Sequence, residues 1–296
     1  MNNVQKIIKE ICDEKNINFK LISNDWIIIL EKDNKKRYII GYKFPLNNQS
    51  VGKICDDKYA VYEIMKTFNI PVVDHFIAFR NYNKKELMDY CQKYNFDVVV
   101  KDNYGTCGKN MYHIKNKKEL LTKIKELLKI TESIVISPYY NIKTEYRNII
   151  LNNEIELIYG KKKPIIKGNG KNTIYELLCE FNKEYFEKIS NKKLNKVLKP
   201  NEIYEYNWQF NLSKGSMPFL LEDKQKEEII KQMAKTISDI IETKFASIDI
   251  VELEDNSLLL LEINSGVMMD KLSINLENGK QLAKNIYSKA IDEMFK

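Results

Sequence analysis

The chain has 296 residues, 44% hydrophobic and 30% charged, which is enough for one large unit or two to three compact lobes. The net charge of +7 is spread along the sequence without an arginine-rich block, so it gives little support for binding to nucleic acid. Five cysteines without a Cys-x-x-Cys pair indicate neither a disulfide scaffold nor a zinc site, and two histidines disfavour a Ser-His-Asp triad. Without a signal peptide or a membrane-spanning apolar run, we expect a cytoplasmic protein with no membrane partner.

Hydrophobic periodicity predicts a small N-terminal α+β lobe over residues 1–54. It contains a helix at 3–15 and two strands at 26–30 and 37–41, and it ends in a polar linker at 47–50.

A central lobe is predicted over residues 55–132. Its first helix begins at Asp56 or Asp57 and ends before Asn69-Ile70-Pro71, because proline favours an extended residue before it. The elements that follow are a strand at 75–79, a helix at 84–94, a buried strand at 96–101, a polar turn at 102–110, a strand at 111–114 and a helix at 117–129.

A C-terminal lobe is predicted over residues 133–296, and the sequence contains no internal repeat. Its elements are a strand at 133–137, a hairpin at 146–151 and 154–159, a basic turn at 160–172, helices at 173–190 and 223–243, a second hairpin and a final helix at 279–295.

The second hairpin carries acidic side chains between its apolar residues. Asp249 lies in the first strand, and Glu262 and Asn264 lie in the second, where residues two apart share a face. Two carboxylates and an amide oxygen are suited to Mg²⁺ that holds nucleotide phosphates. The alternative is a pair of ordinary strands with acidic residues in solvent.

A glycine-containing turn follows the buried strand, with Lys101 at the strand end and then Gly105 and Gly108. Glycines let backbone N–H groups approach phosphate oxygens, and a lysine supplies a cation. The spacing fits neither the P-loop nor the dinucleotide-binding pattern, so the alternative is a hairpin turn with a surface lysine. A second lysine, Lys58, begins the first helix of the central lobe.

These segments, in this order, resemble an ATP-grasp carboxylate–amine ligase, in particular the ATP-grasp part of cyanophycin synthetases and of bifunctional glutathione synthetases. The resemblance extends from about residue 5 to the C-terminal end. The matching segments are Asp57-Lys58 with Ile70-Pro71, Val100-Lys101 with Gly105 and Gly108, Thr144–Arg147, Gly168–Leu177, Asn211–Gly215, Ile248-Asp249 and Leu261–Asn264.

The resemblance implies an α+β ATP-grasp fold, in which two α+β lobes clasp ATP after the small N-terminal lobe. It also implies ATP and Mg²⁺, or Mn²⁺ in its place, as cofactors. The resemblance implies that Lys58 and Lys101 contact the phosphates of ATP, under a cover formed by Gly105 and Gly108. Ser137, Tyr139 and Tyr140 would form the adenine hinge, and Glu145 would hold the ribose. Arg147, Lys161 and Lys214 would lie near the reacting groups, and Asp249, Glu262 and Asn264 would hold the metal.

The implied reaction joins a carboxylate to an amine through an acylphosphate, with release of ADP and phosphate. The implied substrates are small molecules, an amino acid or a short peptide, and the implied assembly is a homodimer or homotetramer that binds no nucleic acid.

Several residues depart from the family pattern. Pro138 at the hinge has no N–H, Lys161 replaces an arginine, and Asn207 replaces another. Two alternatives stay open: an ATP-binding protein without ligase activity, and a carboxylate–thiol ligase or kinase of the same fold. Trp208 is interpreted as part of an aromatic packing cluster.

Overall fold

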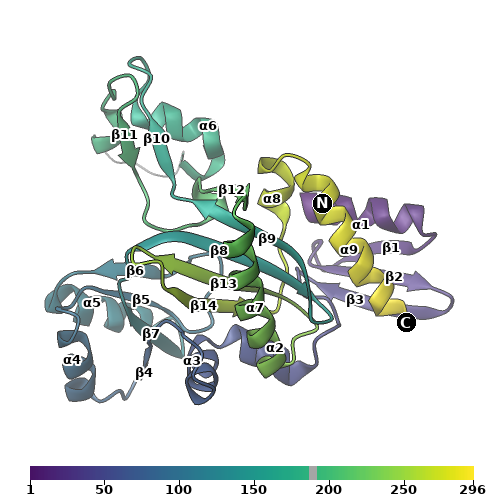
Figure 1. Cartoon of the computed structure of the whole chain (residues 1–296), viewed down its shortest axis with the longest axis horizontal. Helices are drawn as coiled ribbons and strands as arrows, with labels where there is room; N and C mark the ends of the chain where they lie inside the picture. Colours follow the sequence, from purple (N-terminus) through teal and green to yellow (C-terminus); the bar gives the residue numbers. More distant parts are fainter. Residues whose placement is uncertain (187–191) are drawn as a thin grey trace.

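The computed structural model describes residues 1–186 and 192–296, with an architecture of mixed helices and antiparallel sheets (Figure 1). The predicted helix at 173–190 appears as α6 (Ile174–Phe186), and the rest of its predicted range lies outside the described residues. No described helix has the length and apolar composition needed to cross a membrane.

The N-terminal lobe combines both ends of the chain. A three-stranded antiparallel sheet packs with helices from residues 3–14 and from the last part of the sequence, and these elements share one apolar core (Figure 1). The lobe is therefore not confined to residues 1–54, and β1 and α8 were not predicted. Its elements are α1 (Asn3–Glu14), β1 (Asn18–Ile22), β2 (Ile27–Lys32), β3 (Lys35–Ile40), α8 (Asp270–Asn275) and α9 (Gly279–Phe295).

The predicted linker at 47–50 is wrong, because it begins the helix α2 (Gln49–Asp56). The Asn48 side chain accepts a hydrogen bond from the Val51 N–H, so the polar run is a helix N-cap.

The central lobe contains a four-stranded antiparallel sheet in the order β4-β7-β5-β6. Because β7 lies inside this sheet, the predicted boundary between residues 132 and 133 separates a strand from its partners and is wrong. The elements are α3 (Lys58–Thr67), β4 (Phe76–Phe79), α4 (Lys84–Gln92), β5 (Val98–Asp102), β6 (Met111–Ile114), α5 (Lys117–Leu127) and β7 (Ser133–Pro138).

The largest sheet has five antiparallel strands in the order β12-β9-β8-β13-β14. Apolar side chains on one face pack against α2, α3 and α7. Side chains that alternate with them point to the other face, where the charged residues of the predicted site gather. The elements are β8 (Ile142–Leu151), β9 (Glu154–Lys162), β12 (Met217–Leu220), α7 (Lys224–Ile241), β13 (Phe245–Leu253) and β14 (Leu258–Asn264).

A β-bulge interrupts the β13–β14 pairing. Asp249 pairs with Glu262, but the next residue, Ile250, pairs with Leu260, which leaves Leu261 as an extra residue in β14.

A small unit extends away from the five-stranded sheet (Figure 1). The predicted basic turn at 160–172 is wrong, because β9 continues to Lys162 and β10 follows in the same stretch. The elements of the unit are β10 (Ile165–Lys167), α6, a 3₁₀ helix at Lys192–Asn195, β11 (Ile203–Glu205) and a second 3₁₀ helix at Leu212–Lys214.

Candidate active site

A pocket of about 610 Å³ lies between the central lobe, the five-stranded sheet and the N-terminal lobe. Its volume is within the usual range for cofactor and small-molecule sites. Among the predicted site residues, Lys214 and Asp249 do not line it. Those that do are Lys58, Lys101, Gly105, Gly108, Ser137, Tyr139, Tyr140, Glu145, Arg147, Lys161, Glu262 and Asn264.

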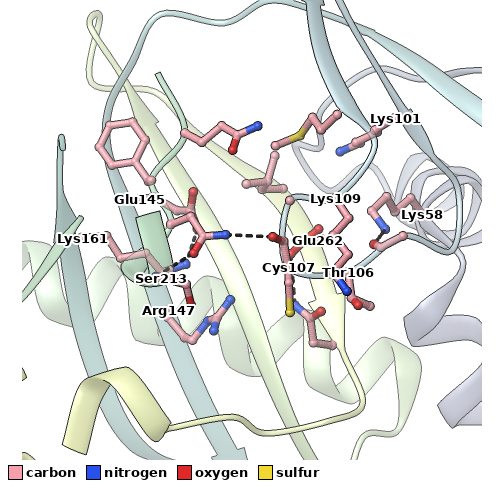
Figure 2. A pocket seen from close by; sticks show the side chains of 18 of the residues that line it. Lys58, Lys101, Thr106, Cys107, Lys109, Glu145, Arg147, Lys161, Ser213 and Glu262 are labelled. Atoms are coloured by element: carbon pink, nitrogen blue, oxygen red, sulfur yellow. Dashed lines mark hydrogen bonds and ion pairs between the residues drawn. The ribbon is translucent and has the colours of Figure 1, made fainter. Parts of the chain in front are cut away.

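Two lysines approach the pocket from the central lobe, opposite Glu145, Arg147 and Lys161 in the view of Figure 2. Lys58 begins α3, and its Nζ donates to the Gly105 carbonyl at 2.6 Å. Lys101 lies near the end of β5 with 6% of its surface exposed. Burial, followed by the charge of Lys58, lowers the pKa of Lys101 to about 8. An anionic group in this pocket would relieve the repulsion between the two lysines.

The glycine-containing loop after β5 is held from the other side of the pocket. The Asn211 side chain donates to the Cys107 carbonyl at 3.0 Å, and Lys214 Nζ donates to the Gly108 carbonyl at 3.0 Å. Lys214 Nζ also donates to Gln209 Oε1 at 2.5 Å. Lys214, predicted to lie near the reacting groups, has its ammonium group bonded to the loop in this structure. We call the Asn211 and Lys214 bonds the loop latch.

A row of charged side chains crosses the five-stranded sheet. Glu145 and Arg147 on β8 are directly opposite Lys161 on β9 and Asp249 on β13, respectively. Asp249 is in turn opposite Glu262 on β14. Residues opposite each other in a sheet share a face, so all five belong to the pocket side.

Asp249 lies beneath the pocket surface and is fully buried. Both carboxylate oxygens are bonded by Arg147, and Lys161 Nζ is 3.4 Å from Oδ1. Burial opposes ionisation, but Arg147 and Lys161 outweigh it and hold the pKa of Asp249 below its usual value. The prediction of Asp249 as a metal ligand thus conflicts with its pairing, since a metal would have to displace a bidentate arginine.

Lys161 is also buried, between Glu145 and Asp249. Burial and the charge of Arg147 lower the pKa of Lys161, but the two carboxylates outweigh them and raise it overall. Lys161 thus bonds Oε1 of Glu145, and the carboxylate keeps further acceptor sites on the pocket side.

Glu262 and Asn264 reach the pocket from β14, and Asn264 Nδ2 lies 3.3 Å from Glu262 Oε1. Within residues 1–186 and 192–296, no cluster of three His, Cys, Asp or Glu side chains is placed to hold a metal. Mg²⁺ commonly uses one or two side-chain oxygens and completes its coordination with phosphates and water. Glu262 and Asn264 fit that donor set.

The predicted hinge has an aromatic wall. The Tyr139 ring stacks on His113 with centroids 3.7 Å apart, and the Trp208 ring meets Tyr139 edge-on at 5.8 Å. Trp208 thus packs in an aromatic cluster with Tyr139 and His113, which are different partners from the nearby aromatic residues expected, and it also lines the pocket. The Tyr139 N–H donates to the Asp97 carbonyl at 3.0 Å, so this backbone N–H of the hinge already has a hydrogen-bond acceptor within the protein.

Sequence reasoning missed the pocket wall formed by the N-terminal lobe. Trp26, Ile40 and Tyr42 line it together with Met268 and Lys271 from the segment after β14. Trp26 is the first residue of a predicted strand, so no local pattern in the sequence indicated that it would line a pocket.

The sequence matches no protein-family model, and a comparison with curated proteins finds no relative. Solved structures do match. A bifunctional glutathione synthetase from Pasteurella multocida aligns with a TM-score of 0.59 and 14% identity, over 98% of this chain and 44% of that one. D-alanine–D-alanine ligase from Bacillus anthracis aligns with a TM-score of 0.58 and 16% identity, over 86% and 71%. A RiPP-associated ATP-grasp ligase from Chryseobacterium gregarium, in complex with ADP and leader and core peptides, aligns with a TM-score of 0.56 and 14% identity, over 97% and 92%.

These likenesses establish the fold, and the predicted ATP-grasp architecture is confirmed. The chain spans less than half the length of the glutathione synthetase that it matches.

Proposed function

We propose that this chain, which has the ATP-grasp fold, binds ATP in the pocket and joins a carboxylate to an amine. The observation that carries the proposal is the convergence of Lys58, Lys101, Glu262 and Asn264 on one pocket from three separate elements. The similar solved structures support it, because they are named as glutathione synthetase, D-alanine–D-alanine ligase and a RiPP-associated ATP-grasp ligase.

In the proposed reaction, a substrate carboxylate attacks the γ-phosphorus of ATP, and the bond to the β-phosphate oxygen breaks. The products of this step are an acylphosphate and ADP. An amine then attacks the acyl carbon and phosphate leaves, which forms the amide after the nitrogen loses a proton. Positioning and charge neutralisation are what such phosphoryl transfer requires, so no side-chain nucleophile is needed.

The residues of the chain would divide this work. Lys58 and Lys101 would neutralise the phosphates from the central lobe, under the loop of Gly105 and Gly108. Arg147, held in place by Asp249, would face the phosphoryl and carboxylate groups. Mg²⁺, or Mn²⁺, held by Glu262 and Asn264 would supply further charge neutralisation.

The Glu262→Ala variant tests the proposal. We expect it to abolish ADP release in the presence of Mg²⁺ and pairs of amino acids or short peptides, with the fold retained. Glu254→Ala is the matched control, because Glu254 is an exposed acid in the turn of the same hairpin. Mass spectrometry of the products identifies the bond that forms. Undiminished ADP release by Glu262→Ala would refute the mechanism.

One rival function is nucleotide binding without ligation. The pairing of Lys161 with Glu145 favours it, since it engages a lysine that was predicted to face the reacting groups. A protein of this kind would bind ATP with Mg²⁺ but would release no ADP with any substrate pair.

A further inference from the structure

The pocket extends beyond Asn264 to a surface on the N-terminal lobe. We call Trp26, Ile40 and Tyr42, together with Met268, the N-lobe wall. Two of its large apolar side chains are accessible, with 58% of Trp26 and 47% of Ile40 exposed. Accessible apolar side chains that line a pocket are binding surface, in contrast to isolated ones elsewhere on a protein.

Local backbone geometry fixes the position of this wall. The Trp26 ring lies over Gly41, where a Cβ atom would be 2.7 Å from the ring and where φ is +60°. The Gly41 N–H donates to the Trp26 carbonyl at 2.9 Å, and Ile40 and Lys43 exchange two backbone hydrogen bonds. Only glycine combines this φ with room for the indole, so Trp26 is held in place.

The wall is adjacent to the proposed reaction centre. The Val267 N–H donates to the Tyr42 carbonyl at 3.0 Å, and Val267 is three residues after Asn264. A molecule that contacts Tyr42 and Trp26 would therefore lie next to the end of β14, where the phosphates would be held.

A lysine supplies the charge at this end of the pocket. Lys43 is paired with Asp56, but Lys271 has no ion-pair partner in the part of the chain that the structure describes. An unpaired ammonium group at a pocket wall complements a carboxylate.

We propose that the N-lobe wall is the subsite for the amine substrate, and that this substrate is an amino acid with an apolar, preferably aromatic, side chain. Its side chain contacts Trp26 and Ile40, and its own carboxylate, which does not react, pairs with Lys271. This inference rests on the proposed ligase function, in which the reacting carboxylate belongs to the other substrate.

The two tryptophans of the chain make a direct test possible, because both line this pocket and they lie on different lobes. In the Trp208→Phe variant, Trp26 is the sole tryptophan and its fluorescence reports the N-lobe wall. With Mg²⁺ and a non-hydrolysable ATP analogue present, L-phenylalanine should change the emission saturably. Glycine and L-phenylalaninamide, which lack the side chain and the carboxylate respectively, should each bind at least ~10-fold more weakly, a difference of about 1.4 kcal/mol.

A variant at Lys271 tests the contact with the substrate carboxylate separately from the contact with the substrate side chain. Lys271→Ala should weaken the binding of L-phenylalanine to the level of L-phenylalaninamide, while the amide itself binds as before. Equal affinity for L-phenylalanine and glycine, or no saturable change in Trp26 emission, would overturn the inference.

A second measurement distinguishes a failure of the proposed ATP binding from a failure of the subsite alone. In the Trp26→Phe variant, Trp208 reports the hinge end, and the ATP analogue alone should change its emission. No response of Trp208 to the analogue would reject ATP binding itself. A response of Trp208 without any response of Trp26 to L-phenylalanine would reject only the subsite.

Discussion

Arg147 bonds both carboxylate oxygens of Asp249, with Nε 2.8 Å from Oδ1 and Nη2 2.5 Å from Oδ2. Asp249 is buried and Arg147 is partly buried, and the planar two-point geometry of the pair fixes the guanidinium in one orientation. Asp249 thus positions a cation at the pocket floor, while Glu262 and Asn264 remain accessible for a metal.

The first prediction concerns this pair. Asp249→Asn should lower the free energy of unfolding by about 3 kcal/mol, because it leaves Arg147 and Lys161 with one fewer compensating charge in a buried site. It should also lower kcat at least ~10-fold, which is about 1.4 kcal/mol in activation free energy. Urea denaturation and steady-state ADP release measure the two effects.

The Mg²⁺ concentration for half-maximal activity separates the two roles of Asp249. A positioning role leaves it unchanged in Asp249→Asn, whereas a large increase would assign Asp249 to the metal. As a control, the double variant Arg147→Met, Asp249→Leu should regain most of the lost stability without activity, because it removes both buried charges together.

The second prediction is a pH dependence of nucleotide affinity. Phosphates favour the charged form of Lys101, so nucleotide binding raises its pKa above the value of about 8 in the free protein. Affinity should therefore be fully present below pH 8 and should fall as the pH rises above it. Calorimetric titration with a non-hydrolysable ATP analogue at several pH values measures the fall.

Lys101→Arg tests the assignment to this residue. Arginine stays charged in this pH range, so the decline above pH 8 should disappear. The same decline in Lys101→Arg and in the original protein would assign it to another group.

The third prediction concerns the loop latch. Lys214→Met removes the donor to the Gly108 carbonyl, so the loop should open more often and be cleaved faster in limited proteolysis. We expect KM for ATP to rise ~3-fold to 10-fold, with less effect on kcat, because Lys214 does not line the pocket. Lys167→Met, at a lysine on β10 of the small unit, is the control.

A Lys214→Met variant with normal KM and a large loss of kcat would instead place Lys214 at the reacting groups. Asn211→Ala should reproduce the effect on KM and proteolysis, since it removes the other half of the loop latch.

Much of the fold could be predicted because its signals are local. The apolar periodicity of α1 and α9 reflects which face each helix buries, and this appears in a single sequence. The β7 boundary and the assembly of the N-terminal lobe could not be predicted. Both depend on which distant element fills a sheet edge or a helix face, and short strands carry no information about their partners.

The same distinction applies to the site. That Glu262 and Asn264 share a face follows from their spacing, and the structure confirms it, since both line the pocket. The pairing of Asp249 with Arg147 depends on the register between β8 and β13, which nothing near either residue specifies. Trp26 reaches the pocket only because the N-terminal lobe packs beside the end of β14.

The extra residue in β14 allows one strand to present apolar side chains to the core and polar side chains to the pocket. Leu260 and Ile263 are three residues apart, yet both belong to the apolar core that α2 and α3 cover at β14, which a regular strand cannot achieve. Leu261 reverses the alternation between them, so the strand keeps its apolar contacts along its whole length while Glu262 and Asn264 face the pocket. If the same residues formed a regular strand without the bulge, Leu260 and Glu262 would share one face, and either the leucine would leave the core or the carboxylate would leave the pocket.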